Sequence, residues 1–317
     1  MKKILALFLA AVMLIGMAAC SKNEKTGVTV NIGVLKGPTG MGAAWLMDQN
    51  EQGLSANSYN FTIAGAPDVL TGQLISGDMD MAALPTNAIS TLYNKTEGKI
   101  TVLGVNALGV IYILENGDRI NSVADLEGKT ILASGQGSTA EYVLNYILEQ
   151  NGVSADIFWA SEHSEAATLA LSGEYDIVML PEPFVTTVTT KNGSFRVALD
   201  LTREWEALGG GELTMGGIAV RTEFLEAHPD AVKAFVKEYA SSVAFTNAQP
   251  ADAAKLIAKY EIAAEEITKN AIPRCNIVWL HGENYKAKLE NFLGVVYEAN
   301  PAGIGGKMPG DDFYQSY

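Results

Sequence analysis

Two stretches of the sequence, 96 residues apart, repeat one pattern of turns and apolar residues. The first reads GDMDMAALP at residues 77–85, and the second reads GEYDIVMLP at residues 173–181. In each, a glycine ends a helical pattern, an acidic turn follows, four apolar residues form a strand suited to burial, and a proline begins the next helix. The repeat predicts an α/β chain with two similarly built halves, and the alternative is a chance likeness between ordinary α/β turns.

A glycine-rich turn stands at nearly the same offset in each half. Residues 37–42 (GPTGMG) and residues 134–139 (SGQGST) each follow an apolar strand pattern and open a helical one. Glycine allows the backbone to turn tightly and to approach a ligand. Ser138 or Thr139 can cap the following helix and leave other first-turn amides free for a negative or electron-rich group. We therefore expect the two turns to face each other across a cleft.

Short apolar runs alternate with helical patterns from residue 28 onward, as in an α/β fold with a mixed sheet in each half. The apolar stretch 104–114, interrupted by Gly109, and the glycine-rich pattern at 215–220 are suited to two crossings between lobes. Helical spacing dominates from residue 229, and the tail at 301–317 has the glycines and prolines of a loop. The predicted division is a signal peptide at 1–19, a tether at 20–27, lobe 1 at 28–107 plus 216–317, and lobe 2 at 108–215.

The first twenty residues have the composition of an export signal. A basic end precedes an apolar core, residues 4–17, that is too short to span a bilayer comfortably, and AAC at residues 18–20 forms a small-residue cleavage site. This ending resembles a bacterial lipoprotein signal, so we expect cleavage before Cys20 and lipidation of its thiol. An ordinary secretory signal is the alternative. The expected location is outside the cytoplasm, anchored to the bacterial cell membrane by the N-terminal lipid.

The net charge of the chain argues against one class of partner. With 36 acidic and 22 basic residues the formal net charge is −14 at pH 7, and such a surface repels phosphate backbones and anionic headgroups. We therefore expect no nucleic-acid partner, although a small anion can still bind where local dipoles dominate. After lipidation of Cys20 the remaining thiol is Cys275, so the fold must be stable without an internal disulfide.

The sequence offers no motif for covalent, metal or nucleotide chemistry. The three histidines, His163, His228 and His281, are far apart, and none has a second ligand at metal-binding spacing. We interpret His163 as a hydrogen-bonded surface residue. A nucleophile elbow, a Cys/His pairing and a Walker loop are absent from the sequence. We therefore predict that the protein is not an enzyme and has no catalytic residue, metal or cofactor.

The strand-to-helix turns form the candidate ligand site, because open α/β sheets bind ligands at the edge where their strands end. Trp159 ends a strand pattern of the second half and can add a stacking wall. Glu182 is either an exposed acid at a helix start or a carboxylate that accepts hydrogen bonds from ligand N–H groups. The predicted ligand-binding residues are Thr39, Gly40, Met41, Pro67, Pro85, Thr86, Asn87, Gly137, Ser138, Thr139, Trp159, Pro181 and Glu182.

Together these features resemble a known family. The lipoprotein start, the turn at 37–42, the repeat at 77–85 and 173–181, and DLEGKTI at 125–131 leading into GQGST look like the extracytoplasmic binding proteins of ABC importers. The pattern is most similar to the nitrate, taurine and aliphatic-sulfonate type, which includes binders of the thiamine pyrimidine precursor. The resemblance implies a type II periplasmic-binding-protein fold, in which two α/β lobes joined by two crossover strands close over a ligand.

The resemblance also implies partners: a small-molecule ligand, a membrane permease and a separate ATPase subunit, with the binding protein itself a monomer. Met41 and Leu84 stand where a sulfonate site is expected to have polar or basic residues. This argues against a sulfonate and favours a partly apolar, pyrimidine-like heteroaromatic ligand. A small anion (sulfonate, nitrate or carboxylate) stays the other candidate. The alternative is an enzyme on the same fold, since relatives make the thiamine pyrimidine or dehydrate a menaquinone precursor. A surface adhesion or sensor module is a third alternative.

Overall fold

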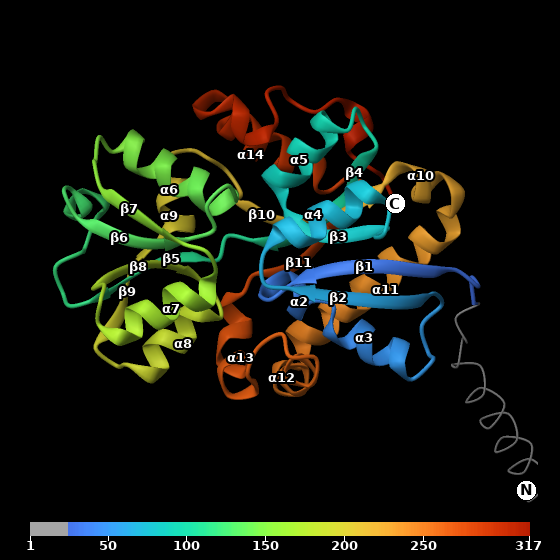
Figure 1. Ribbon diagram of the computed structural model, residues 1–317, viewed down its shortest axis with the longest axis horizontal. Helices are drawn as coiled ribbons and strands as arrows, with labels where there is room; N and C mark the ends of the chain where they lie inside the picture. Colours follow the sequence, from blue (N-terminus) through green and yellow to red (C-terminus); the bar gives the residue numbers. More distant parts are fainter. Residues whose placement is uncertain (1–24) are drawn as a thin grey trace, which may run out of the picture.

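The computed structural model describes residues 25–317, which form two β-sheets flanked by helices (Figure 1). We call the part of the chain built on the first sheet lobe 1 and the part built on the second sheet lobe 2. The predicted α/β class with two mixed sheets is confirmed. The residue boundaries given above for the lobes stay a prediction. The predicted signal peptide and the lipidation residue Cys20 lie outside the described residues.

Lobe 1 is built on a sheet whose strand order, in the described part of the chain, is β11-β4-β10-β3-β1-β2. β1 runs parallel to β2 and β3, whereas β10 is antiparallel to both β3 and β4. The strands are β1 (Thr29–Leu35), β2 (Ser58–Ala64), β3 (Met81–Pro85), β4 (Ile100–Leu108), β10 (Thr214–Arg221) and β11 (Ile277–His281).

Lobe 2 is built on a sheet with the order β7-β6-β8-β5-β9. β6 runs parallel to β7 and β8, whereas β5 is antiparallel to both β8 and β9. The strands are β5 (Ile111–Asn116), β6 (Thr130–Ser134), β7 (Asp156–Ala160), β8 (Ile177–Pro181) and β9 (Phe195–Asp200). Apart from β11, the two sheets therefore have the same topology.

The chain passes between the sheets twice, and each passage contributes a strand to the sheet that it enters. β5 follows β4 of the other sheet, and β10 follows β9 in the same way. Gly109 lies in the first passage, and a Cβ atom there would overlap the side chain of Thr202 in the second passage. Glycine is required at this position because the two passages approach each other so closely.

Helices cover both faces of each sheet (Figure 1). In lobe 1 the helices are α2 (Pro38–Met41), α3 (Ala44–Glu51), α4 (Pro67–Ser76), α5 (Thr86–Lys95), α10 (Thr222–Ala227), α11 (Pro229–Ala248), α12 (Pro250–Lys259), α13 (Glu265–Ala271) and α14 (Lys286–Ala299). In lobe 2 they are α6 (Thr139–Gln150), α7 (His163–Ser172), α8 (Phe184–Lys191) and α9 (Leu201–Ala207). Short 3-10 helices are η1 (Val123–Leu126), η2 (Ile272–Arg274), η3 (Pro301–Ile304) and η4 (Asp311–Phe313).

The repeat seen in the sequence is a repeat of structure. Gly77 ends α4 with φ +87°, and Gly173 ends α7 with φ +82°. Both residues are in the left-handed region, which glycine enters without a steric penalty and which closes the helix end. Each is followed by a buried strand, β3 or β8, that ends in a proline. The predicted helix–strand–helix unit is therefore confirmed in both halves, but the repeated proline does not begin the next helix: Pro85 and Pro181 end β3 and β8, and the helices begin at Thr86 and Phe184.

The C-terminal tail is not the simple loop that its composition predicts. η3 and η4 interrupt it, Phe313 is fully buried, and Tyr314 forms a β-bridge with Val102 of β4. The Tyr285 hydroxyl donates a hydrogen bond to the Val102 carbonyl at 2.9 Å. The tail is ordered by contacts with β4, which lies far earlier in the chain, so the local pattern of glycines and prolines does not reveal these contacts.

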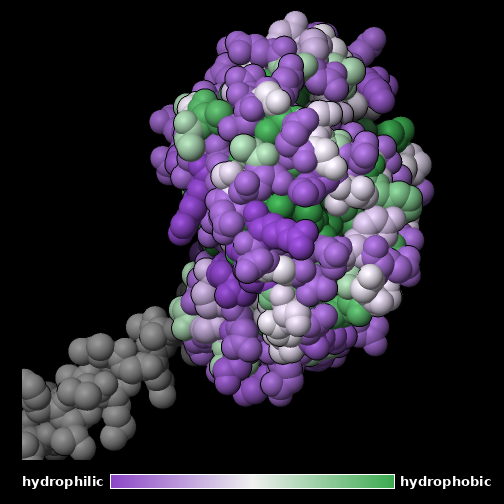
Figure 2. All heavy atoms as spheres, turned by 90° about the vertical axis from the view of Figure 1, so that its left-hand side faces the viewer, coloured by the Kyte–Doolittle hydropathy of each residue, from purple (hydrophilic) through white to green (hydrophobic). Residues whose placement is uncertain are grey.

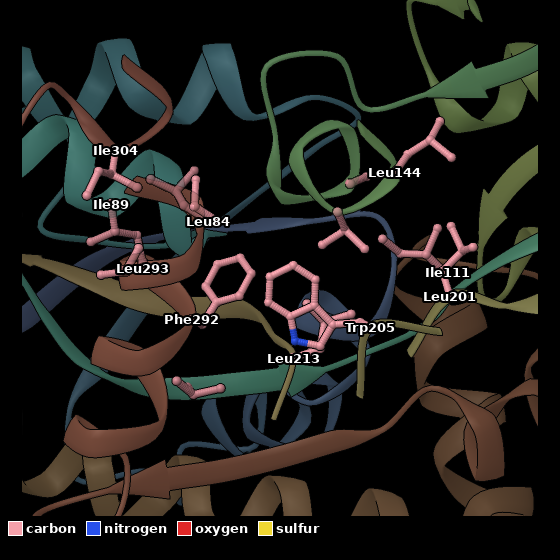
Figure 3. Close-up of a cluster of buried hydrophobic side chains, with 14 of the residues drawn as sticks. Leu84, Ile89, Ile111, Leu144, Leu201, Trp205, Leu213, Phe292, Leu293 and Ile304 are labelled. Atoms are coloured by element: carbon pink, nitrogen blue, oxygen red, sulfur yellow. The ribbon is translucent and has the colours of Figure 1, made fainter. Parts of the chain in front are cut away.

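One apolar core extends across both lobes (Figure 3). Trp205 of α9 is fully buried, and its ring centroid lies 5.0 Å from that of Tyr146 in α6 and 5.5 Å from that of Phe292 in α14. α9 and α6 belong to lobe 2, and α14 packs on lobe 1. On this side the lobes are therefore joined by packed side chains in addition to the two passages of backbone.

The surface of the lobe 2 end is predominantly hydrophilic. Figure 2 shows this face, on which hydrophobic side chains appear near the middle and in smaller separate groups elsewhere. Within residues 25–317, no helix combines the length and the apolar character that crossing a bilayer requires.

Replacing Trp205 with alanine tests the shared core. Trp205→Ala removes a buried indole and leaves a cavity, so we expect the free energy of unfolding to fall by about 3–5 kcal/mol. Phe158→Ala is the control, because 51% of Phe158 is exposed, and it should cost less than about 1 kcal/mol. Urea unfolding followed by circular dichroism measures both, and equal losses would contradict a core position for Trp205.

Candidate functional site

A cavity of about 870 Å³ lies between the two lobes. Its walls are the turns after β1, β2 and β3 of lobe 1 and the turns after β6, β7 and β8 of lobe 2. These are the carboxyl ends of the parallel strands, where α/β sheets bind ligands. The expectation that the two glycine-rich turns face a common cleft is confirmed. The predicted residues that line the cavity are Thr39, Pro67, Pro85, Asn87, Gly137, Ser138, Thr139, Trp159 and Pro181.

The other predicted residues lie outside this lining: Gly40, Met41, Thr86 and Glu182. Met41 is fully buried, and its Sδ lies 3.8 Å from Cys275 Sγ. The Thr86 hydroxyl donates a hydrogen bond to the Thr214 carbonyl at 2.6 Å, which ties α5 to β10. Neighbouring residues of one turn point in different directions, so the position of a turn alone does not reveal which side chain faces the cavity.

The turn before α6 satisfies its own backbone. Gly135 and Gly137 have φ values of +90° and +75°. The Gly137 amide donates to Glu141 Oε2 at 2.5 Å, the Ser138 amide to the Gly135 carbonyl at 3.1 Å, and the Ala140 amide to Ser138 Oγ at 3.3 Å. The bond from Ala140 is the predicted helix cap, and Gly137 and Ser138 precede the helix. Within the first turn the Glu141 amide is also occupied, by the Ser138 carbonyl at 3.0 Å, so the expectation of free amides fails there.

Thr39 presents a polar atom that has no partner among the described residues. Thr39 lines the cavity, but its Oγ1 is buried away from solvent and has no hydrogen bond to a described residue. A buried hydroxyl in that state carries a free-energy cost. Thr39 is the residue through which the first turn contributes to the lining, and its hydroxyl is not exposed to the cavity in this arrangement.

Asn87 and Thr139 connect the lobes at the edge of the cavity. The Thr139 hydroxyl donates to Asn87 Oδ1 at 3.0 Å. The Asn87 amide nitrogen donates to the carbonyls of Gly137 and Gly303, each at 3.2 Å. The polar atoms of the Asn87 side chain are thus occupied by protein groups. In this arrangement the Asn87 side chain links the lobes and has no polar atom available for a ligand.

The charge of the lining differs in sign from that of the whole chain. The charged side chains in it are Lys36, Asp68 and Lys95. Among the ion pairs of the described residues, none includes Lys36 or Lys95. The cavity therefore has a local excess of positive charge in a chain whose net charge is −14. The sequence reasoning missed both lysines; Lys36 directly follows β1, which is a signal that it could have used.

His163 is not the surface residue that the sequence suggested. It lines the cavity, and its Nδ1 lies 2.7 Å from Ser134 Oγ. Burial lowers the pKa of His163 to about 4, although the Glu162 carboxylate beside it acts in the opposite direction. The ring also lines a second cavity of about 410 Å³, which shares Lys36 and Gly65 with the first. His163 is therefore neutral near pH 7 and stands where the two cavities meet.

Glu182 fits neither of the roles considered from the sequence. It is fully buried and accepts hydrogen bonds from the amide and hydroxyl of Thr186 at 3.1 and 2.8 Å. Its Oε1 forms an ion pair with Arg274 Nη2 at 2.7 Å. Arg274 lies in η2, directly before β11 of lobe 1, so the pair joins the lobes. A signal for this partner is absent from the sequence because the two residues are 92 positions apart.

The arrangement is suited to binding. Within residues 25–317, no group of three or more His, Cys, Asp or Glu residues is placed to hold a metal ion. Ser134 is fully buried, and burial raises the pKa of the Cys275 thiol, which keeps it protonated. Hydroxyl and imidazole groups, two lysines and apolar walls from Trp159 and three prolines surround a space large enough for a small organic molecule.

Comparisons with known proteins agree with this geometry. The family model described as NMT1/THI5 like matches residues 73–253. No curated protein matches the sequence. Among solved structures, an ABC transporter protein from Parabacteroides distasonis is similar, with 22% identity, 91% of this chain and 99% of that chain covered, and a TM-score of 0.75.

Two further structures carry ligand names in their descriptions. The alkanesulfonate-binding protein SsuA from Xanthomonas axonopodis pv. citri, bound to MOPS, has 18% identity, covers 89% of this chain and 95% of its own, and has a TM-score of 0.70. The periplasmic nitrate-binding protein NrtA from Synechocystis PCC 6803 has 14% identity, covers 89% of this chain and 85% of its own, and has a TM-score of 0.63. Similarity at these identities shows the fold, which is the type II periplasmic-binding-protein fold.

The ion pair between the lobes can be tested by removing its cation. The Glu182 carboxylate is fully buried, whereas half of the Arg274 side chain is exposed, so Arg274→Met removes one charge-assisted hydrogen-bonding partner at a place that water can approach, and the free energy of unfolding should fall by about 1.5–3 kcal/mol. Arg203→Met is the matched control, because Arg203 pairs with Asp200 while 84% of its side chain is exposed, and it should cost less than about 1 kcal/mol. Chemical denaturation measures both, and a loss for Arg274→Met no larger than the control would contradict the argument.

The lowered pKa of His163 predicts a pH dependence of stability. In the unfolded chain this histidine titrates near its ordinary value of about 6.5, but in the folded protein it stays neutral down to about pH 4. The unfolded state therefore binds more protons in this interval, and stability falls as the pH is lowered from about 6.5 to about 4.

The control for this effect is His163→Gln, which lacks the titrating group. The difference in free energy of unfolding between wild type and His163→Gln should be constant above about pH 6.5 and shift in favour of the variant below it. Parallel stability curves for the two proteins between pH 4 and pH 7 would contradict a neutral, partly buried His163.

Proposed function

The chain belongs to the NMT1/THI5-like family, and from this premise we propose that it is a solute-binding protein that captures a small molecule between its lobes and delivers it to an ABC import permease. The observation that carries the proposal is the cavity of about 870 Å³ walled by strand-to-helix turns from both sheets. A ligand in this position touches both lobes at once, so it favours the closed arrangement over an open one.

The lining supports a ligand that is partly apolar and carries a hydrogen-bonding or negative group. Trp159 and the prolines offer flat apolar contacts, Gln136 offers a side-chain amide, and the lysines offer positive charge. The related proteins described as binding alkanesulfonate and nitrate bind anions. We propose a small anion, such as a sulfonate, nitrate or carboxylate, or a pyrimidine-like heteroaromatic as the ligand class.

The proposal includes the partners and the location inferred from the resemblance. The chain would act as a monomer outside the cytoplasm, held at the membrane by a lipid on Cys20, and would meet a permease whose ATPase is a separate subunit. The enzyme alternative requires an accessible reactive group. Ser134, which is bonded to His163 at the cavity wall, is fully buried, so the binding function is favoured.

A ligand screen followed by a measurement of shape tests this function. Sulfonates, nitrate, pyrimidines, flavins and small carboxylates are added one by one, and a compound that binds the native state raises the melting temperature. Small-angle scattering with and without that compound should then show a smaller radius of gyration when it is bound. Stabilisation without any change in dimensions would contradict closure, and turnover of the compound would favour the enzyme.

A second test removes the hydrogen bond between Thr139 and Asn87, which connects the lobes, and measures the effect on ligand affinity. Thr139→Val removes the hydroxyl that donates to Asn87 and should weaken binding of the stabilising compound about two- to tenfold, because the closed state loses one hydrogen bond. Thr168→Val is the control, since the Thr168 hydroxyl bonds only within α7, to the Ser164 carbonyl. Equal affinities for both variants would mean that the contact between Thr139 and Asn87 does not contribute to closure.

A further inference from the structure

The cavity continues beyond the cleft into a groove between α4 and α5. Asp68, Thr71 and Ile75 of α4 line it, and so do Ala88, Thr91 and Lys95 of α5. Each set follows the spacing i, i+3, i+7, which places its members along one face of a helix. The floor includes Leu92, whose buried side chain belongs to the same apolar core as Leu70 and Leu74 of α4.

The groove leads away from the cleft. Both helices begin at a strand-to-helix turn of the cleft, α4 after Ala66 and α5 after Pro85, and both run outward from there. Seven residues of helix rise by about 10 Å, so Ile75 and Lys95 lie roughly that far from the first helical turns. A solute no larger than the cleft itself would leave this outer part empty.

The outer end of the groove has two features suited to a ligand. Ile75 is 59% exposed although it lines the cavity, so a ligand lying in the groove would remove apolar surface from water. Lys95 is exposed, and none of the ion pairs of the described residues includes it. An apolar contact followed by an unpaired lysine is complementary to a ligand whose hydrocarbon part ends in an acidic group.

We propose that this groove is a second part of the ligand site and that the natural ligand is an elongated molecule with an apolar body and an acidic group at each end. One acidic group meets Lys36 in the cleft, the body lies on Ile75 and Leu92, and the other acidic group meets Lys95. Asp68 lines the same cavity at the start of α4, so a further negative charge on the body of the ligand would be repelled near this carboxylate. This inference rests on the proposed solute-binding function and narrows its ligand class.

The test uses linear α,ω-dicarboxylates from succinate to dodecanedioate as probes, with binding followed by calorimetry. For the wild type we expect affinity to rise along the series by roughly two- to fourfold for each CH₂ that enters the groove. Ile75→Asn should flatten this rise. Val69→Asn is its matched control, because Val69 lies on the same helix and is 55% exposed but does not line the cavity.

The charge at the far end is tested with Lys95→Met. This variant should weaken dodecanedioate binding about two- to fivefold and should weaken binding of the monoacid dodecanoate much less. Lys99→Met is the control, since Lys99 is also exposed and lies outside the lining.

Two outcomes overturn the inference. In the first, the rise along the series is the same in Ile75→Asn as in the wild type. In the second, no dicarboxylate binds at all. Either result leaves the proposed function open to its own test, because binding of a short sulfonate, nitrate or pyrimidine in the cleft and closure around it do not require the groove.

Discussion

The backbone pairing of two strands, β5 and β10, is the interaction on which the rest of this molecule depends. Each strand arrives from the other lobe and inserts, antiparallel, between two strands of the sheet that it enters. Backbone N–H and C=O groups buried in a sheet must be paired. Neither strand can therefore leave its sheet without breaking the backbone hydrogen bonds to both neighbouring strands. The two passages therefore connect the lobes at fixed points. Any motion of one lobe relative to the other would have to bend the backbone of these connecting segments.

The position of the candidate site follows from this exchange of strands. In each sheet the inserted strand lies beside three parallel strands whose carboxyl ends reach the cavity. β10 also shapes the wall itself: a Cβ atom at Gly216 would come within 2.9 Å of both Asn106 Oδ1 and Thr39 Cγ2, so glycine is needed where the first turn presses on the strand. The strand that joins the lobes and the lining of the cavity thus share residues, because Met215 and Gly216 of β10 belong to both.

The site combines side chains with the backbone of its turns. Around Gly137 several amides bond within the protein, with Glu141 as acceptor for one of them. The side chains that line the cavity include Gln136, an imidazole, two lysines and apolar walls. Recognition by side chains is more easily changed by substitution than recognition by backbone, which is consistent with one fold that serves several ligand classes.

Local chemistry explains why much of the fold was predictable. Prolines at the first position of α4, α11 and α12, and left-handed glycines after α4 and α7, act within a few residues of their own position. The same markers gave the positions of the turns that wall the cavity. They did not distinguish Thr39 from Met41, or Pro181 from Glu182, because the direction of a side chain within a turn depends on what packs against it.

The amino-acid sequence by itself determined the alternation of strands and helices, the internal repeat and the edge at which a ligand site forms, because short-range sterics and apolar periodicity decide these. The tertiary structure alone decided that Glu182 pairs with Arg274, that Trp205 packs on Phe292, and that Ile75 and Lys95 border one groove. Each of these contacts joins residues far apart in the chain. They form because two surfaces pack together in the folded molecule. A local sequence pattern does not specify which distant residues will be in contact.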